Sequence, residues 1–117
     1  MNKRALGAQY ESLAADWMLE RGFRILARNF RSRYGEIDLV ALDEKEERPV
    51  LVFVEIKYRN TLKYGYAEEA VGLKKQMTIR QTAEFYRTRF RVPDTVPCRF
   101  DVIAIQSGEV RHIVNAF

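Results

Sequence analysis

The stretch that decides the fold runs from Gly35 to Lys57 and reads GEIDLVALDEKEERPVLVFVEIK. Two apolar runs, 37–42 and 50–56, flank a charged segment, DEKEER, which is followed by Pro49. Apolar runs of this length around a charged, proline-containing segment are typical of two buried strands joined by a solvated loop. The sequence therefore predicts a hairpin at the centre of the chain.

Both predicted strands carry charges where a buried strand is normally apolar. Asp38 lies in the first strand, and Glu55 and Lys57 lie in the second. Because side chains alternate between the faces of a strand, Glu55 and Lys57 share a face and stand roughly 6.6 Å apart. Burying either charge alone costs several kcal/mol, so the two need each other, a metal ion or water. This pattern indicates a functional site.

Composition narrows the class of protein. The 117 residues suit one domain, 1–117, and a hydrophobic content of 47% supports an ordinary packed core. A net charge of +4, from 20 basic and 16 acidic residues, suits a polyanionic partner. The single cysteine and single histidine exclude an internal disulfide, a cysteine-based zinc site and a histidine-rich metal site. With no apolar run of membrane-spanning length and no signal-peptide pattern, we expect a soluble, cytoplasmic protein without membrane contacts.

The rest of the chain predicts helices and further strands. Residues 5–21 predict an amphipathic helix that ends near Gly22, and a strand follows from Phe23. Residues 68–89 predict a second helical stretch, with a bend or two consecutive helices near 74–77. That expectation rests on two offset apolar stripes, Tyr66, Ala70, Leu73 and Met77, and then Ile79, Ala83, Tyr86 and Phe90.

Two final strands are expected from CRFDVIAI, 98–105, and VRHIV, 110–114. The predicted order is therefore helix, strand, strand, strand, helix, strand, strand. Such an order favours an α/β sandwich, with a mixed sheet covered by helices. His112, in the last strand, is expected to be a surface or core residue rather than a catalyst.

Charged residues outside the central hairpin leave more than one interpretation open. Glu11 lies at the edge of the buried face of the first helix, either as a solvated flank residue or as an acid that leans toward the other acids. Arg31 and Arg33 belong to a basic segment with interleaved aromatic residues, which suits phosphate contacts with occasional stacking. Solvated charges on an edge strand would look similar. Lys75, on the second helix, is a further candidate phosphate contact.

If the two central strands are neighbours, Asp38 and Glu55 meet on one face near the strand ends. Converging carboxylates repel one another unless a cation lies between them, and oxygen ligands without Cys or His favour Mg²⁺ or Mn²⁺. A lysine such as Lys57 then orients the attacking water or offsets charge on a scissile phosphate. The structural alternative is an ion pair that holds a strand in place.

The chain resembles a known family over nearly its whole length. The matching segments are GAQYESLAADWML, RNFRSRYGEIDLVA, VFVEIKYR, EEAVGLKKQ, CRFDVIAI and the terminal NAF. They resemble the small bacterial endonuclease-like proteins of family UPF0102, and the pattern is similar to the PD-(D/E)xK nuclease superfamily. By that similarity, Asp38 takes the place of the metal-binding Asp, and Glu55 and Lys57 take the places of the (D/E)xK pair. Glu11 matches the helix acid of the archaeal Holliday-junction resolvases. Ile37 stands where the motif has Pro, which removes no ligand.

This resemblance implies a restriction-endonuclease-like α/β/α sandwich with a central mixed β-sheet flanked by helices. It also implies an endonuclease that needs Mg²⁺ or Mn²⁺ and hydrolyses phosphodiester bonds in nucleic acid, for which we expect DNA, including branched or junction DNA. The resolvase likeness implies a homodimer. The alternatives are a non-catalytic nucleic-acid-binding module on a nuclease fold and an interaction subunit whose acids are ion-paired.

The resemblance also assigns a role to each site residue. Asp38, Glu55 and the backbone carbonyl of Ile56 would hold the ion, and Glu11 would complete its shell directly or through water. Lys57 would orient the nucleophilic water and stabilise developing charge. The phosphate contacts would come from Arg31, Arg33 and Lys75.

Overall fold

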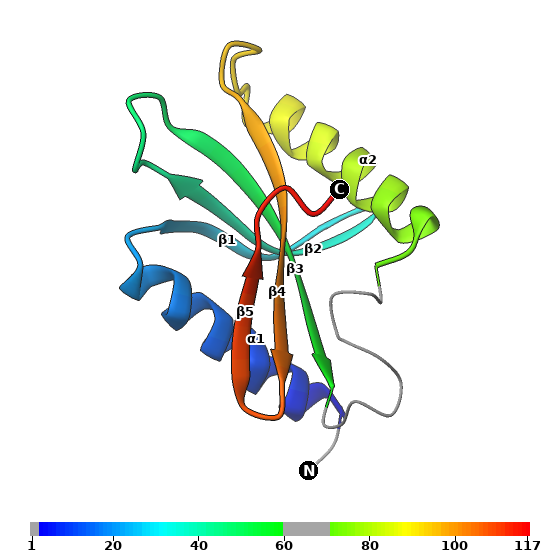
Figure 1. The fold of residues 1–117 in the computed structure, drawn as a ribbon. Coiled ribbons are helices and arrows are strands. Elements are labelled where there is room, and N and C mark those ends of the chain that lie inside the picture. Colours follow the sequence, from blue (N-terminus) through cyan, green and yellow to red (C-terminus); the bar gives the residue numbers. More distant parts are fainter. Residues whose placement is uncertain (1–2, 60–70) are drawn as a thin grey trace.

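A computed structural model of the chain describes residues 3–59 and 71–117 (Figure 1). The elements follow in the predicted order: α1 (Lys3–Glu20), β1 (Arg24–Ser32), β2 (Gly35–Asp43), β3 (Val50–Arg59), α2 (Leu73–Arg89), β4 (Cys98–Gln106) and β5 (Glu109–Ile113). The central hairpin expected from the sequence is formed by β2 and β3, which pair in antiparallel fashion.

The described strands form one five-stranded sheet in the order β1-β2-β3-β4-β5. Neighbouring strands are antiparallel except β3 and β4, which are parallel. Parallel neighbours need a crossover connection, and the chain between β3 and β4 contains α2. The sheet is therefore mixed, as the sequence predicts.

The two helices pack on opposite faces of the sheet. Strand β3 contributes side chains to both cores, because successive side chains along a strand point to opposite faces. On β3, Val52, Val54 and Ile56 belong to the core that α1 covers, whereas Leu51 and Phe53 belong to the core that α2 covers. The helices contribute small and medium side chains to these cores: Ala14, Ala15 and Met18 from α1, and Ile79, Ala83 and Tyr86 from α2. The α/β/α sandwich is thus confirmed.

The first helix ends where the sequence predicts. Gly22 has a φ of 89°, its N–H donates to the carbonyl of Leu19, and the N–H of Phe23 donates to the carbonyl of Met18. This pair of bonds is a Schellman motif, in which a glycine adopts the left-handed conformation that other residues avoid. It turns the chain directly from α1 into β1. Helical spacing also predicts that Leu13 lies on the buried face of this helix, but Leu13 is 43% exposed, which corrects that prediction.

The second helix departs from the prediction at its start. It begins at Leu73, after Gly72 in extended conformation, and continues as one helix to Arg89, so the expectation of two consecutive helices is wrong. Leu73 and Met77 are 78% and 63% exposed. The reason is that Lys75 in the first turns reaches Glu55, so this end of α2 lies over the polar end of β3.

The rest of that helix agrees better with the sequence. Ile79, Ala83 and Tyr86 are buried as predicted, but Phe90 is 53% exposed. The predicted stripe residues Tyr66 and Ala70 lie outside the described residues. The buried stripe therefore begins at the middle of α2, where apolar strand residues lie beneath it.

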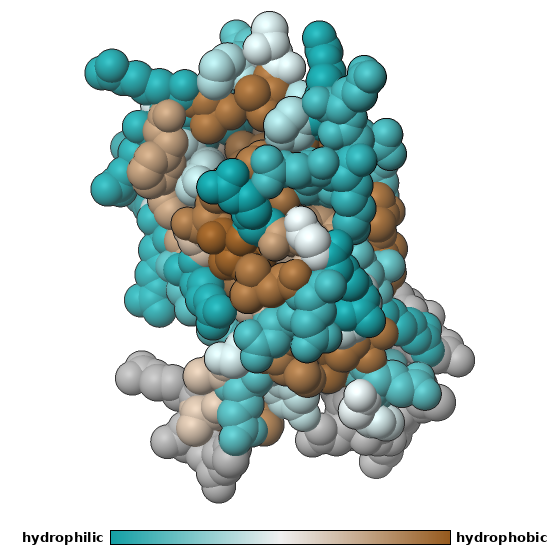
Figure 2. Space-filling view, turned by 90° about the vertical axis from the view of Figure 1, so that its left-hand side faces the viewer, coloured by the Kyte–Doolittle hydropathy of each residue, from teal (hydrophilic) through white to brown (hydrophobic). Residues whose placement is uncertain are grey.

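The surface is mixed in character. Figure 2 shows one side of the molecule, on which apolar patches are bordered by hydrophilic side chains. Leu13 and Leu19 of α1 and Leu26 of β1 are among the large apolar side chains that stay exposed. In the described part of the chain, no helix is long and apolar enough to cross a membrane.

The tip of the β1–β2 hairpin packs closely against α2. A Cβ added at Gly35 would lie 2.4 Å from Cγ2 of Thr78, nearer than real atoms approach. The Thr78 side chain has little freedom to move away, because its hydroxyl donates to the carbonyl of Lys74 at 3.1 Å. Glycine at position 35 therefore sets how closely the hairpin tip approaches the helix.

We expect Gly35→Ala to lower the free energy of unfolding by about 1–3 kcal/mol, since the added methyl group overpacks this contact. Urea denaturation measures the change. Gly7→Ala is the matched control, because a Cβ at Gly7 meets nothing within 4 Å. Equal stability of Gly35→Ala and wild type would show that the hairpin tip can move away from α2 without cost.

Candidate functional site

Strands β2 and β3 separate at the position of the predicted site. Their pairing runs from Asp43 opposite Val50 to Leu39 opposite Val54. Beyond that point β2 continues beside β1, and β3 continues beside β4 (Figure 1). Asp38 is next to Leu39 and Glu55 is next to Val54, so both acids lie just beyond the last pair of the ladder. The fork between the strands therefore brings both acids to one place.

The Asp38 carboxylate closes the end of this ladder. Its Oδ2 accepts a hydrogen bond from the backbone N–H of Ile56 at 2.8 Å. Burial first, and then the charge of Glu55, raise the pKa of Asp38 to about 7, and Glu11 contributes in the same direction. The Ile56 N–H and the charge of Lys75 oppose this rise without cancelling it. An acid so placed changes its charge near neutral pH.

Glu55 is the more deeply buried acid, at 5% exposure. Two ammonium groups approach its Oε1, Lys57 Nζ at 3.5 Å and Lys75 Nζ at 3.8 Å. The predicted juxtaposition of Glu55 and Lys57 on one face is confirmed. The ammonium group of Lys75 lies close to Glu55 and acts on Asp38, because the first turns of α2 cover this end of β3. Its phosphate contact stays a prediction.

Glu11 lies at the same place, although it comes from α1. A cavity of about 150 Å³ is lined by Gly7, Tyr10, Glu11, Asp38, Glu55, Ile56 and Tyr58. The Oε2 of Glu11 accepts a hydrogen bond from Nδ2 of Asn29 at 3.0 Å. The sequence left two interpretations of Glu11 open, a solvated flank residue or an acid close to the other acids. The structure agrees with the second, because Glu11 lines the same cavity as Asp38 and Glu55.

Four of these residues were not predicted as site residues from the sequence: Gly7, Tyr10, Tyr58 and Asn29. Tyr10 and Tyr58 stack with ring centroids 4.3 Å apart and form a wall of the cavity. Asn29 has a φ of 52°, a left-handed conformation that asparagine tolerates better than most residues. The sequence signal for this residue is an asparagine within a predicted strand, where asparagine is uncommon. The tyrosines gave none, because their stacking depends on how α1 lies on β3.

The donor set fits a hard divalent cation. Asp38 and Glu55 supply carboxylate oxygens, and Mg²⁺ and Mn²⁺ take such oxygens together with backbone carbonyls and water. Among the residues that the structure describes, no three His, Cys, Asp or Glu side chains lie close enough to hold an ion as a group. An ion at this place would therefore take two carboxylates, with backbone oxygen and water completing its shell.

The predicted arginine contacts lie apart from the cavity, near the tip of the β1–β2 hairpin. Arg31 Nε is 3.6 Å from the carboxylate of Glu36, and both side chains are exposed. The Arg33 guanidinium lies over the ring of Tyr34, 5.0 Å from its centroid, and donates to the Tyr34 hydroxyl at 2.8 Å. Neither arginine lines the acid cavity. Their exposure leaves them available to a large ligand.

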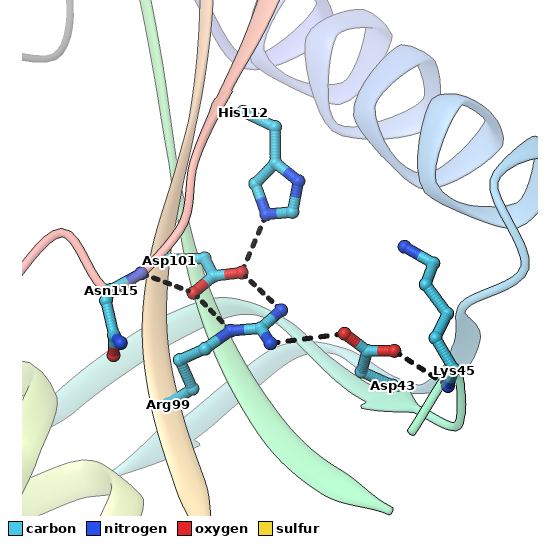
Figure 3. A network of polar contacts seen from close by, with 6 residues as sticks. All are labelled: Asp43, Lys45, Arg99, Asp101, His112 and Asn115. Carbon is cyan, nitrogen blue, oxygen red and sulfur yellow. Dashed lines mark hydrogen bonds and ion pairs between the residues drawn. The ribbon is translucent and has the colours of Figure 1, made fainter.

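A second charged cluster joins β2, β4 and β5 and was not predicted (Figure 3). At its centre Asp101, which is fully buried, accepts two hydrogen bonds from Arg99 at 2.9 Å and one from the N–H of Asn115 at 3.1 Å. His112 Nε2 lies 2.6 Å from Asp101, and Arg99 also donates to Asp43 at 3.1 Å. Burial favours a raised pKa for Asp101, but the bonds from His112, Arg99 and Asn115 outweigh it and hold the pKa below its usual value.

Within this cluster His112 is largely buried, and its lack of a catalytic role stays a prediction. Its ring also meets Trp17 and Phe23 edge-on, with centroids 5.6 Å apart in both pairs. The cluster lies on the α1 face of β4 and does not line the acid cavity. It therefore fastens the last strand to the sheet.

We expect Asp101→Asn to lower the free energy of unfolding at pH 7 by about 3–5 kcal/mol, because the buried Arg99 charge loses its main partner. Since the folded pKa of Asp101 is depressed, this stabilisation exists above about pH 4 and is lost as pH falls below that. Denaturant titrations at pH 7 and at pH 3 measure both values. Asp16→Asn, an exposed change on α1, is the control. A loss below 1 kcal/mol at pH 7 would contradict the account.

Fold and site together define a small α/β protein with an acidic cavity at the fork of its central strands. A sequence model of the Uncharacterised protein family UPF0102 matches residues 10–105. The chain is 47% identical over 117 residues to a UPF0102 protein of Lachnoclostridium phytofermentans, covering 100% of this chain and 96% of the relative. It is 40% identical over 111 residues to one from Persephonella marina, covering 95% and 91%. A third, from Clostridioides difficile, is 40% identical over 119 residues, with 100% of both chains covered. The chain belongs to family UPF0102.

Proposed function

We propose that this protein is an endonuclease that uses Mg²⁺ or Mn²⁺ to hydrolyse phosphodiester bonds in nucleic acid, with DNA as its substrate. The observation that carries the proposal is the convergence of Asp38, Glu55 and Glu11 on one cavity, with Lys57 beside Glu55. A protein that only bound phosphate would gain nothing from buried acids that repel it. The same residues match the PD-(D/E)xK pattern, so we infer membership of that superfamily and a relation to the archaeal Holliday-junction resolvases.

Each residue of the cavity has a role in this proposal. Asp38 and Glu55 would hold the ion, with the Ile56 carbonyl as a backbone ligand, and Glu11 would act through water. A bound divalent ion supplies charge neutralisation at the scissile phosphate and lowers the pKa of bound water. Lys57, held near Glu55, orients the attacking water and offsets the negative charge that develops on the phosphate. Lys75 Nζ is close enough to Glu55 to balance its charge and to meet a phosphate at the cavity mouth.

Binding of the nucleic acid backbone is assigned to Arg31, Arg33 and Lys75. Replacing each with Ala is expected to weaken DNA binding to a similar degree for all sequences and to reduce the salt dependence by about one unit. Fluorescence anisotropy at several salt concentrations measures that slope. Arg24→Ala is the control, because Arg24 pairs with Glu44 away from the acid cavity. An unchanged slope in all three variants would place the DNA on another surface.

A non-catalytic nucleic-acid-binding module is the second candidate. It is favoured by the observation that Glu55 already has two lysine partners and that Asp38 already binds the Ile56 N–H. Each of these two acids thus has a polar partner without an ion. Calorimetric titration of Mn²⁺ separates the candidates. Heat of binding in wild type that is absent from Asp38→Asn favours the enzyme, and no heat in either protein favours the binding module.

The proposed function is tested by a panel of labelled substrates, incubated with Mg²⁺, with Mn²⁺ or with a chelator. The panel includes four-way junctions, flaps, nicked and continuous duplexes, single strands and RNA. The proposal requires cleavage of at least one DNA substrate that stops when the ion is removed. Cleavage of junctions at two symmetric positions would also agree with a homodimer, which the resolvase relation leads us to infer. No cleavage of any member would overturn the proposal.

A further inference from the structure

A second hollow lies between the tip of the β1–β2 hairpin and the middle of α2. It has a volume of about 360 Å³ and is lined by Tyr34, Gln81, Glu84, Phe85 and Thr88. We call it the Tyr34 hollow. It shares no lining residue with the acid cavity, and the roles assigned above leave it unused.

The ring of Tyr34 is exposed but held in place. The side chain is 40% exposed, and its centroid lies 6.4 Å from that of Phe85 in an edge-on contact. Arg33 donates to its hydroxyl, and the Tyr34 N–H donates to Oγ of Ser32 at 3.0 Å. The close packing of Gly35 on α2 fixes the hairpin tip itself. A ring that is already ordered loses little conformational entropy when a ligand stacks on it.

The lining has the chemistry that a nucleobase requires. Tyr34 and Phe85 offer aromatic surface for stacking, which is how proteins bind unpaired bases. Gln81 has an amide, Glu84 a carboxylate and Thr88 a hydroxyl, so the residues that line the hollow include both donors and acceptors. Ligand pockets generally start at about 300 Å³, so the hollow suits a ligand of the size of one base with its sugar.

The charges along α2 suit a strand that passes over it. Residues 73–91 contain one acid, Glu84, and six basic residues. Arg80 and Arg87 contact β4 and the loop before it, so the basic residues left for a strand near the hollow are Lys74, Lys75, Arg89 and Arg91. Lys75 pairs with Glu55 at the acid cavity. Gln81 and Phe85 come six and ten residues after Lys75 in the sequence. At a rise of 1.5 Å per residue the hollow therefore lies about 9–15 Å along the helix from Lys75. The helix turns by about 100° per residue, so the lining residues of the hollow lie on another face of α2 than Lys75. A strand that reaches both places therefore passes around the helix.

We propose that the Tyr34 hollow receives one unstacked nucleobase, so that the substrate of the proposed endonuclease carries unpaired nucleotides beside the bond it cuts. Such substrates are single strands, flaps and branches, whose bases are free to enter the hollow. A continuous duplex keeps its bases stacked and must spend a few kcal/mol to extrude one. This inference rests on the proposed function for the cleavage it describes, but base binding itself requires no cleavage.

Binding is tested with a single-stranded DNA that carries 2-aminopurine, whose fluorescence falls when it stacks on an aromatic ring. The protein carries Asp38→Asn and a chelator is present, so that no strand is cut. Tyr34→Leu keeps apolar bulk and removes the aromatic face. It is expected to weaken binding of the single strand on the order of tenfold and to reduce the quenching, with a smaller loss of duplex binding because Arg33 loses its partner.

Two further variants make this result specific. Tyr34→Trp keeps an aromatic face and should restore both affinity and quenching. Phe90→Leu removes an exposed ring from the end of the same helix, outside the hollow, and should change neither. Melting temperatures confirm that all variants are folded. Equal affinity and equal quenching in wild type and Tyr34→Leu would overturn the inference.

The inference and the proposed function fail in different ways. If the wild-type protein cleaves nothing while quenching still depends on Tyr34, the endonuclease proposal fails and the base-binding hollow stands. If wild type cleaves continuous duplex as fast as single strands and Tyr34→Leu cleaves both equally well, the endonuclease stands and the inference is overturned. A preference for single-stranded over duplex substrate that disappears in Tyr34→Leu supports both.

Discussion

Asp38→Asn is expected to give a protein that is more stable than wild type at pH 8 and that has lost Mn²⁺ binding and cleavage together. An asparagine side chain can still accept the hydrogen bond from the Ile56 N–H. It is uncharged, so the cost of burying a carboxylate and the repulsion from Glu55 and Glu11, which together raise the pKa of Asp38, both disappear. The same change removes a carboxylate ligand, so metal affinity falls. A site that costs stability in order to hold an ion is expected of a catalytic centre.

The sign of the pH dependence follows from the pKa of Asp38, which rises from 3.8 to about 7 on folding. The folded state binds this proton more tightly than the unfolded state, so wild type loses stability as pH rises from about 4 to 7. Above pH 7 the loss is complete and amounts to about 1–4 kcal/mol. The advantage of Asp38→Asn should therefore be small near pH 4 and largest above pH 7.

Thermal and urea denaturation between pH 4 and pH 8, without divalent ions, measure this difference. Asp16→Asn is the matched control, because Asp16 is exposed on α1 and should show no such trend. Saturating Mn²⁺ should raise the melting temperature of wild type at pH 8 and leave Asp38→Asn unchanged. A variant that is less stable than wild type at every pH would show that Asp38 stabilises the fold as a charged group.

Lys57→Met is expected to lower cleavage on the order of 10²-fold or more while metal binding, DNA binding and folding survive. The substitution keeps the aliphatic stem and removes only the ammonium group. Losing one preorganised electrostatic contact at the reacting phosphate has an effect of that size. Glu55 still has Lys75 at 3.8 Å, so the loss of stability should stay well below the about 3–5 kcal/mol of a broken buried pair.

Two comparisons make the Lys57 result interpretable. Glu55→Gln should lose metal affinity and activity together, because it removes a carboxylate ligand. Lys74→Met removes an exposed ammonium from the neighbouring helix and should change neither. The melting temperature and the metal-dependent cleavage rate are measured on the same preparations. A fully active Lys57→Met protein would remove Lys57 from the mechanism, and a grossly destabilised one would favour the structural ion pair.

Much of the fold could be predicted because its signals are local. The alternation in 50–56, the charged loop before Pro49 and the glycine after the first helix each act within a few residues, and each proved correct. The pairing of Glu55 with Lys57 follows from the same alternation. The meeting of Asp38 and Glu55 was predicted on the condition that the two central strands are neighbours, and their pairing in the structure meets that condition.

Other features depend on contacts between distant segments, which a single sequence does not reveal. The bonds of Asp101 to His112 and Asn115 require the register of β4 against β5. The exposure of Leu73 and Met77 depends on where α2 lies on the sheet, because helical spacing alone does not say which turns meet an apolar surface. The Asn29 bond to Glu11 depends on a left-handed residue within a strand.

The most direct test of the central claim is metal-dependent cleavage of one labelled flap DNA by wild type and Asp38→Asn, purified in parallel. We expect wild type to cut the strand in Mn²⁺ or Mg²⁺, to stop when a chelator is added, and to resume when the ion is restored. Asp38→Asn, folded and still bound to the DNA, should cut at least about 10²-fold more slowly. Equal cleavage by both proteins, or none by wild type with either ion, would contradict the claim that Asp38 and Glu55 form a metal-dependent nuclease site.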